Sequence, residues 1–177
     1  MVEKAGRAAR TRASILAATR DLLIGGSTRP PTVGEVASNA GVSRLTVYHH
    51  FGSHAGLIAA LAAEARSMPR PGEEISGLEQ LRATIRRSCE HWARDPALFR
   101  RLPAAAEIGA PDHELAQRLA ADDGLRPGCS LKEAEDMIAV LTSFAAFDRL
   151  HQDGRRSTAA VVEILMRMAG AIAPSGA

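Results

Sequence analysis

The chain has 177 residues, of which 46% are hydrophobic and 24% charged, so it can bury one sizeable core or two small ones and is not an intrinsically disordered protein. Aromatic residues make up only 3%, alanine is abundant and β-branched runs are few, which favours helices over sheets. No apolar stretch is long enough to span a bilayer, the N-terminus lacks the apolar core of a secretory signal, and two cysteines are too few for a disulfide scaffold. These features predict a cytoplasmic protein.

The net charge of +2 is unevenly distributed along the chain. Residues 1–54 hold seven Lys and Arg against three Asp and Glu, together with three of the six histidines, whereas the rest holds 15 basic and 17 acidic residues. A polyanion would therefore meet the first third of the chain. An excess of this size is also compatible with ordinary surface scatter, so charge alone leaves nucleic-acid binding open.

Four helices are expected in the first third of the chain. They cover residues 8–24, 33–39, 44–50 and 54–67. The first ends at Gly25, because glycine tolerates the left-handed turn after a helix. Thr32 and Glu35 form a capping box that opens the second helix. Gly41 allows a positive φ in the following turn, and Ser43 caps the third helix.

The remaining two thirds of the chain are expected to be helical as well. Two prolines and a glycine within residues 68–72 indicate a boundary before this part. Helices are expected over residues 77–94, 96–102, 111–124, 131–152 and 157–172. Since no convincing strand and no internal repeat occur, the sequence predicts an all-α protein of about nine helices.

The two short helices around Gly41 are typical of a helix-turn-helix, which fits a helix into the major groove of DNA. On a wheel of about 100° per residue, the third helix exposes a mixed stripe. The stripe comprises Arg44, Leu45, Tyr48 and His49, flanked by Thr46 and His50. Arginine can bridge guanine O6 and N7, an aliphatic group can touch a thymine methyl, and tyrosine and histidine can donate to phosphates or base edges. The alternative is a small helical hairpin whose Leu45 and Tyr48 pack beneath the C-terminal part.

A set of residues with a specific spacing runs through the same segment. It comprises Thr32, Val36, Ala37, Ala40-Gly41-Val42-Ser43, Thr46, Tyr48, His50-Phe51, Ser53 and Leu57. In these residues, segment 8–66 resembles the N-terminal DNA-binding domain of the TetR family of bacterial transcription regulators. The rest of the chain is similar to the family only in its helical pattern and length. The resemblance implies an N-terminal arm and DNA-binding domain over residues 1–53, a connecting helix over 54–67, and a regulatory and dimerisation domain over 68–177.

The resemblance also implies a DNA-contacting role for particular side chains. Thr32 and Ser43 would offer hydroxyls and helix N-termini to phosphates. The implied base readers are Arg44, Leu45 and His49, and the implied backbone contacts are Thr46, Tyr48 and His50. At His54 the family often has lysine, so a neutral imidazole would make a weaker phosphate contact there, and Gly34 has no side chain to read a base. Arg7 and Arg10, with Lys4 and Arg12, would form an arm along the backbone or minor groove, or else a frayed, solvated terminus.

The helix expected over residues 131–152 is apolar around most of its circumference, which indicates burial on most sides. We therefore expect it to form a four-helix bundle with the final helix and their copies in a second subunit. A homodimer through the last two helices is also what the resemblance implies. Its two-fold axis would place two recognition helices about 34 Å apart on a palindromic operator.

TetR-like proteins usually sense a small molecule in the C-terminal core, so that part should hold an effector site. The candidate lining residues are Cys89, Trp92, Phe99, Met137, Leu141, Phe144 and Phe147, each of which could equally be a packed core residue. Their mostly apolar character favours an apolar or weakly polar ligand. Binding would shift the population towards a spacing of the recognition helices that does not fit the operator.

The expected function is that of a homodimeric repressor released from its operator by a small molecule. A second possibility is the same DNA-binding role under control of a protein partner or without an inducer. A small helical enzyme is a distant third, because the chain has no nucleophile elbow, phosphate-binding glycine loop or zinc-protease motif. Neither Cys89 with His91 nor the histidines His49, His50 and His54 match a structural zinc spacing, so we expect no metal and no cofactor.

Overall fold

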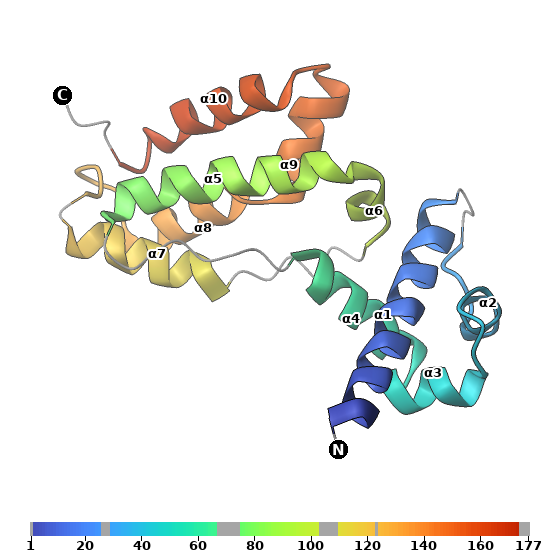
Figure 1. Ribbon diagram of the computed structural model, residues 1–177. Helices are drawn as coiled ribbons and strands as arrows, with labels where there is room; N and C mark the ends of the chain where they lie inside the picture. The colour runs from blue at the N-terminus through green and yellow to red at the C-terminus, as the bar shows by residue number, and fades with distance from the viewer. Residues whose placement is uncertain (1, 26–28, 67–74, 103–109, 123, 174–177) are drawn as a thin grey trace. The chain divides into compact units, whose positions relative to one another are not determined.

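The computed structural model describes residues 2–25, 29–66, 75–102, 110–122 and 124–173. Within these ranges all regular elements are helices and no strand occurs, as the sequence predicts (Figure 1). The elements are α1 (Val2–Ile24), α2 (Val33–Asn39), α3 (Arg44–Phe51), α4 (His54–Arg66), α5 (Gly77–Arg94), α6 (Pro96–Arg101), α7 (Ala110–Ala121), α8 (Leu131–Leu141), α9 (Phe144–Asp148), the π-helical segment η2 (Arg149–Asp153) and α10 (Thr158–Ala169). None of the helices in these ranges has the length and apolar character needed to cross a membrane.

The helix expected over residues 131–152 is interrupted, so the prediction of one continuous helix is wrong. Thr142 ends α8 and Ser143 caps α9. The Thr142 hydroxyl donates to the Ile138 carbonyl oxygen at 2.8 Å, and the Ser143 hydroxyl accepts from the Ala146 amide at 3.2 Å. Hydroxyl groups that bond to the nearby backbone compete with a continuous helix. Because of this break, the described ranges contain ten α-helices instead of about nine.

The chain divides into two compact units. The first comprises residues 1–67 and 97–106, and the second comprises residues 68–96 and 107–177. The short helix α6 contributes to the first unit, because Leu98 is 3% exposed and lies in the hydrophobic core of that unit. The boundary expected at residues 68–72 lies outside the described residues.

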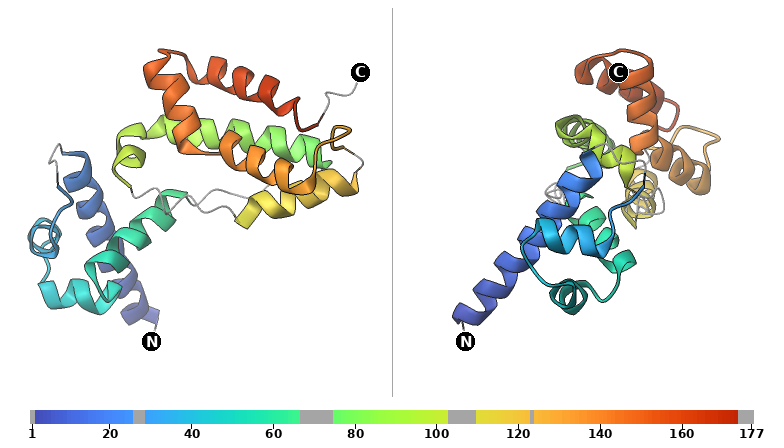
Figure 2. Two further views of the ribbon diagram at one scale, coloured as in Figure 1. Left: turned by 180° about the vertical axis from the view of Figure 1, so that it is seen from behind. Right: turned by 90° about the vertical axis from the view of Figure 1, so that its right-hand side faces the viewer.

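In the first unit, α1 packs against α2 and α4, while α3 packs against both α2 and α4 (Figures 1 and 2). The fully or nearly fully buried side chains of its core include Ile15, Leu16, Leu23, Val36, Val47, Leu57 and Leu61. α1 begins at Val2, earlier than the expected start near residue 8. The core thus fixes the two short helices α2 and α3 against a frame of two longer ones.

In the second unit, α5 packs against α7, α9 and α10, and α8 packs against α7, α9 and α10. Capping boxes open two of these helices, with Ser76 and Glu79 at α5 and Ser130 and Glu133 at α8. The largest fully buried side chains of this unit are Phe147, Leu81, Ile85, Leu119, Ile138, Leu165, Ile172 and Val161.

Candidate nucleic-acid interface

The turn between α2 and α3 has the geometry that a helix-turn-helix requires. Gly41 adopts a φ of 66°, a left-handed conformation that glycine reaches without steric cost. The Val42 amide then donates to the Ala37 carbonyl oxygen at 3.0 Å, which closes the turn. Val36 and Val47, at 0% and 1% exposure, hold the two helices together from the inside. α3 therefore presents its outer face in a defined orientation relative to α2.

Both short helices begin at hydroxyl caps, as the sequence predicts. The Thr32 hydroxyl accepts from the Glu35 amide at 3.3 Å, and the Glu35 carboxylate accepts from the Thr32 amide at 2.7 Å. At α3, the Ser43 hydroxyl accepts from the Thr46 amide at 3.1 Å and lies 2.8 Å from the Thr46 hydroxyl. These caps place Thr32, Ser43 and Thr46 at the N-terminal ends of the two helices, where backbone amides also point outward.

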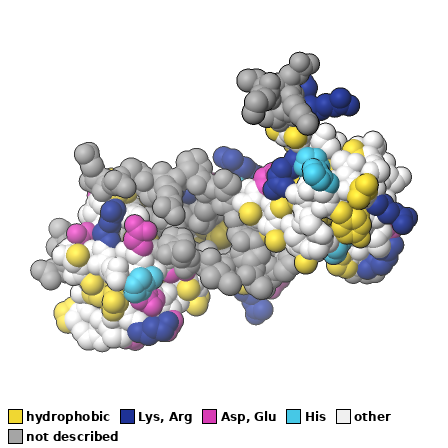
Figure 3. Space-filling view, turned by 90° about the horizontal axis from the view of Figure 1, so that it is seen from below, with side chains coloured by type: hydrophobic (Ala, Val, Ile, Leu, Met, Phe, Trp, Pro, Cys, Tyr) yellow, Lys and Arg dark blue, Asp and Glu magenta, His cyan; other side chains and the backbone are white. Residues whose placement is uncertain are grey.

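The outer face of α3 carries large side chains that do not pack into the first unit. Leu45 is 78% exposed and Tyr48 is 48% exposed, whereas Val47 between them is buried. Arg44 and His49 are exposed as well, while His50 is half-buried and its ring centroid lies 5.7 Å from that of His49. Figure 3 shows histidine, basic and hydrophobic side chains next to one another on this unit. Such a mixture of groups matches the predicted recognition stripe.

Two hollows adjoin α3. One has a volume of about 570 Å³ and is lined by Ser43, Leu45, Thr46, Tyr48 and His49. The other has a volume of about 430 Å³ and is lined by Pro30, Pro31, Thr32, Val33, Gly34, Arg44, Tyr48 and His54. Tyr48 lines both hollows. Together they bring eight of the eleven predicted DNA-contacting residues onto adjoining surfaces of α2, α3 and the start of α4, and the three outside them are His50, Arg7 and Arg10.

His54 lies at the start of α4 and forms a hydrogen bond to the segment before α2. Its Nε2 lies 2.8 Å from the Pro31 carbonyl oxygen, so this nitrogen carries a proton and donates. The contact joins residues that are 23 positions apart, and no local pattern in the sequence could have revealed it. His54 therefore fixes one wall of the hollow in front of α2, and its Nδ1 is the ring nitrogen that remains for another partner.

The single acidic residue between positions 29 and 54 is Glu35, and its charge is compensated. Arg29 donates to both carboxylate oxygens, at 3.1 and 2.5 Å. The hydrogen bond from Arg29, followed by those from the Thr32 amide and hydroxyl, lowers the pKa of Glu35 to about 2. The carboxylate thus stays ionised near neutral pH but is paired, which reduces its repulsion of a polyanion.

Arg7 and Arg10 lie on α1 and are exposed, so in this structure they belong to a helix and not to an extended arm. Arg12 lies further along α1, with its guanidinium carbon 4.6 Å from the centroid of the Phe51 ring at the end of α3. This cation–π contact links α1 to α3. The side chain of Lys4 lies outside the described residues.

The candidate effector residues do not all lie together. Trp92, Phe144 and Phe147 form an aromatic cluster with ring centroids 5.6–6.1 Å apart. Cys89 is buried on α5, and burial raises the pKa of its thiol to about 12. Met137 and Leu141 line an open groove between α8 and α10, and Phe99 lies on α6 in the other unit. The described side chains contain no group of His, Cys, Asp or Glu that could hold a metal ion.

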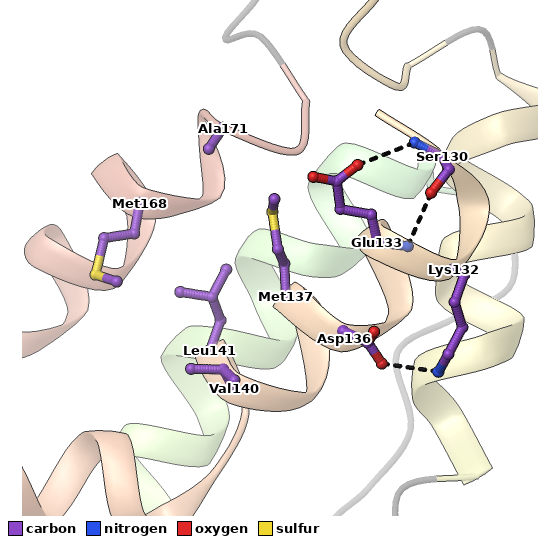
Figure 4. Close-up of a pocket in the computed structure, with 9 residues that line it drawn as sticks. All are labelled: Ser130, Lys132, Glu133, Asp136, Met137, Val140, Leu141, Met168 and Ala171. Atoms are coloured by element: carbon purple, nitrogen blue, oxygen red, sulfur yellow. Dashed lines mark hydrogen bonds and ion pairs between the residues drawn. The ribbon is translucent and has the colours of Figure 1, made fainter. Parts of the chain in front are cut away.

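The groove between α8 and α10 has a volume of about 750 Å³ (Figure 4). Its lining is Ser130, Lys132, Glu133, Asp136, Met137, Val140, Leu141, Met168 and Ala171. Val140 and Met168 are 57% and 51% exposed, and Figure 4 shows them on opposite helices of the groove. The charged groups are engaged locally, because Lys132 pairs with Asp136 at 2.7 Å and Glu133 belongs to the cap of α8. The groove is therefore apolar, with a charged end near the start of α8.

Comparisons with known proteins agree with this arrangement. A family model described as bacterial regulatory proteins of the tetR family matches residues 15–61. Among solved structures, NalD of Pseudomonas aeruginosa, the secondary repressor of the MexAB-OprM multidrug efflux pump, is 19% identical with a TM-score of 0.70, covering 97% of this chain and 100% of that one. TylP, a TetR regulator from Streptomyces fradiae, is 22% identical with a TM-score of 0.68, covering 94% and 88%.

A third structure concerns the control of antibiotic production by bacterial hormones, and it is 22% identical with a TM-score of 0.66, covering 93% of this chain and 98% of that one. At these identities the solved structures establish a shared fold. No curated protein matches the sequence. Together, the fold and the exposed face of α3 define a DNA-binding transcription regulator with a helix-turn-helix. The matched residues run from α1 to α4, so over this domain the chain is similar to the tetR family, which confirms the resemblance predicted from the sequence.

Proposed function

We propose that the protein is a cytoplasmic transcription repressor, and not an enzyme, that binds a palindromic operator as a homodimer and is released by a small, mostly apolar molecule. The observation that carries the DNA-binding role is the exposed face of α3, where Leu45 and Tyr48 protrude from a turn held by buried Val36 and Val47. Phosphate contacts would come from the caps of α2 and α3, and base contacts from Arg44, Leu45 and His49. Residues 1–53 would bind DNA, 54–67 would connect, and 68–177 would regulate and dimerise.

The DNA-binding role is tested by sequencing the genomic fragments that the purified protein retains. We expect a palindromic sequence to be enriched, with an affinity that falls steeply as salt rises, because phosphate contacts release counterions. Replacing Arg44 or Tyr48 by alanine should weaken binding to the enriched duplex about 10- to 100-fold. Arg86→Ala, at an exposed position of α5, is the matched control. Unchanged affinity in both α3 variants would contradict the assignment.

Dimerisation through α8 and α10 is supported by two large apolar side chains that are exposed in the single chain. Val140 and Met168 lie beside the apolar groove, and burying such a face against its copy would remove it from water. A buried, unpaired carboxylate opposes association, so Val140→Asp should give a monomer in gel filtration at micromolar concentration where the natural chain gives a dimer. Ala120→Asp, at an exposed position of α7, should remain dimeric. A natural chain that elutes as a monomer would contradict the proposal.

Release by a small molecule is supported by the apolar character of the second unit. The aromatic cluster of Trp92, Phe144 and Phe147 and the side chains of Met137 and Leu141 are the candidate contacts. A thermal-shift screen with small apolar compounds tests this, since a ligand that binds the folded state raises the melting temperature. A compound that raises it and also weakens operator binding supports the sensor. Operator binding that responds only to a protein partner would favour the alternative form of control.

A further inference from the structure

The second residue of α2 is a glycine whose backbone conformation does not require one. Positive φ angles occur at three glycines in the described part of the chain, and Gly34 is not among them. Glycine within a helix is less favourable than alanine, because it loses more conformational freedom on folding. A reason for the missing side chain must therefore lie in what surrounds Gly34.

The space beside the Gly34 α-carbon is occupied by the side chain of Arg44. A β-carbon at position 34 would lie 3.1 Å from Nη2, 3.2 Å from Nε and 3.4 Å from Cζ of Arg44. Two nitrogens and the central carbon of the guanidinium thus lie next to the position that a β-carbon would occupy. These distances are shorter than the optimal separation of about 3.5–4.0 Å for non-bonded carbon atoms. A side chain at position 34 would therefore require the guanidinium to move away by a few tenths of an ångström.

The guanidinium lies beside Gly34 without using its hydrogen-bond donors. Arg44 forms no hydrogen bond or ion pair with the residues that the structure describes. The nearest acid in sequence, Glu35, is already paired with Arg29 and bonded to Thr32. An arginine has five donors in a fixed fork, and here they remain available while the group lies beside α2.

We propose that Gly34 is a positioning residue for base recognition, and that its lack of a side chain lets Arg44 lie across the N-terminal end of α2, from where it reads a guanine in each half-site. This inference rests on the proposed DNA-binding function. The guanidinium fork matches guanine O6 and N7 in the major groove. A side chain that is already held near its bound position loses less conformational freedom on binding, which strengthens the contact.

A double-mutant cycle tests whether Gly34 acts through Arg44. The wild-type protein first selects its preferred duplex from a pool of randomised double-stranded DNA. Fluorescence anisotropy then measures the affinity of wild type, Gly34→Ala, Arg44→Ala and the double variant for that duplex. Arg44→Ala should weaken binding about 10- to 100-fold by loss of a bidentate base contact. Gly34→Ala should weaken it about 3- to 10-fold by displacing and freeing one arginine side chain. In the Arg44→Ala background, Gly34→Ala should have no further effect.

Selections repeated with each variant provide the specificity readout. Gly34→Ala and Arg44→Ala should relax the preference for guanine at the same base pair. Gly34→Ala should melt at the same or a higher temperature than wild type, because alanine favours the helix. Ser38→Ala, at an exposed position of the same helix, is the matched control and should leave both affinity and base preference unchanged.

The outcomes separate this inference from the function on which it rests. If wild type selects a palindrome and Gly34→Ala selects the same one with equal affinity, the positioning role is overturned while DNA binding stands. An equal loss from Gly34→Ala with and without Arg44 would also overturn it, since Gly34 would then act directly. If wild type selects no sequence at all, the proposed function itself fails.

Discussion

The two units expose different chemistry although they begin their helices with the same device. Capping boxes open α2 in the first unit and both α5 and α8 in the second. The first unit exposes a cation, an aliphatic group, an aromatic ring and imidazoles on one short helix, whereas the second exposes Val140 and Met168 beside an apolar groove. A mixed, acid-poor face suits a polyanion, and an apolar face suits another apolar surface. Caps thus determine where helices begin, and the exposed faces distinguish what each unit binds.

The largest expected effect is the loss of core packing in the second unit. Phe147 is fully buried, and its ring contacts Trp92 at 5.6 Å and His151 at 4.9 Å between centroids. Phe147→Ala should lower the free energy of unfolding of this unit by about 3–5 kcal/mol, because it removes apolar contacts and leaves a cavity. Trp92, the single tryptophan of the chain, reports the transition by fluorescence during denaturation with urea. A loss below about 1 kcal/mol would mean that the aromatic cluster adds little to packing.

A matched substitution in the first unit tests whether the two units unfold independently of each other. Leu57 of α4 is also fully buried, and Leu57→Ala should cost about 2–5 kcal/mol in the first unit and abolish operator binding. The unfolding transition that Trp92 fluorescence reports should occur at the same urea concentration as in the natural chain. If Leu57→Ala moved that transition as much as Phe147→Ala does, the two units would unfold as one, and the division between them would carry no energetic meaning.

A smaller effect is expected from removing one cap in each unit. Thr32→Ala and Ser130→Ala each delete a hydroxyl that accepts from the third amide of a helix, and each should cost about 1 kcal/mol of stability. Only Thr32→Ala should also weaken operator binding, measured by fluorescence anisotropy, because Thr32 lines the hollow in front of α2. Thr32→Ser keeps the hydroxyl and should restore both properties. Equal losses of affinity in the two alanine variants would remove the functional distinction between the caps.

Much of the first unit could be predicted from the sequence because its signals are local. The Thr32 and Glu35 box, the Gly41 turn and the Ser43 cap each lie within a few residues of the helix that they control. The contact from His54 to Pro31 and the approach of Arg44 to Gly34 could not be predicted, because they join different elements.

The second unit also shows that local sequence signals do not reveal the tertiary surroundings of a residue. Its caps at Ser76 and Ser130 were predictable, but the break at Thr142 was not, since the surrounding apolar residues continue the helical pattern. Apolar character also could not separate packed from exposed positions, because Phe147 is fully buried and Val140 is 57% exposed on neighbouring helices. Composition gives the class of a side chain, and only tertiary packing assigns its surroundings.

The smallest expected effect is a response to acid that has opposite signs in the two units. Hydrogen bonds from Arg29 and then Thr32 lower the pKa of Glu35 to about 2, so folding favours its ionised form. This contribution is complete above the ordinary value of 4.5 and is lost as the pH falls towards 2. In the second unit, burial raises the pKa of Asp112, although a hydrogen bond from Thr142 opposes the shift. Folding there favours the protonated form, so stability rises as the pH falls through the raised pKa.

Hydrogen exchange of backbone amides, followed by NMR between about pH 6 and pH 3, separates the two responses because each amide reports on its own unit. Glu35→Gln should reduce the loss of stability that the first unit shows at low pH, because it removes the titrating group and keeps the fold. The pH dependence of the second unit should stay unchanged. Asp112→Asn should remove the gain in stability that the second unit shows at low pH, because an amide cannot change its charge with pH. Parallel loss of protection in both units, with no change in Asp112→Asn, would show that the half-buried carboxyl of Asp112 does not oppose folding. In that case the two units would differ in what they expose but not in how they respond to protons.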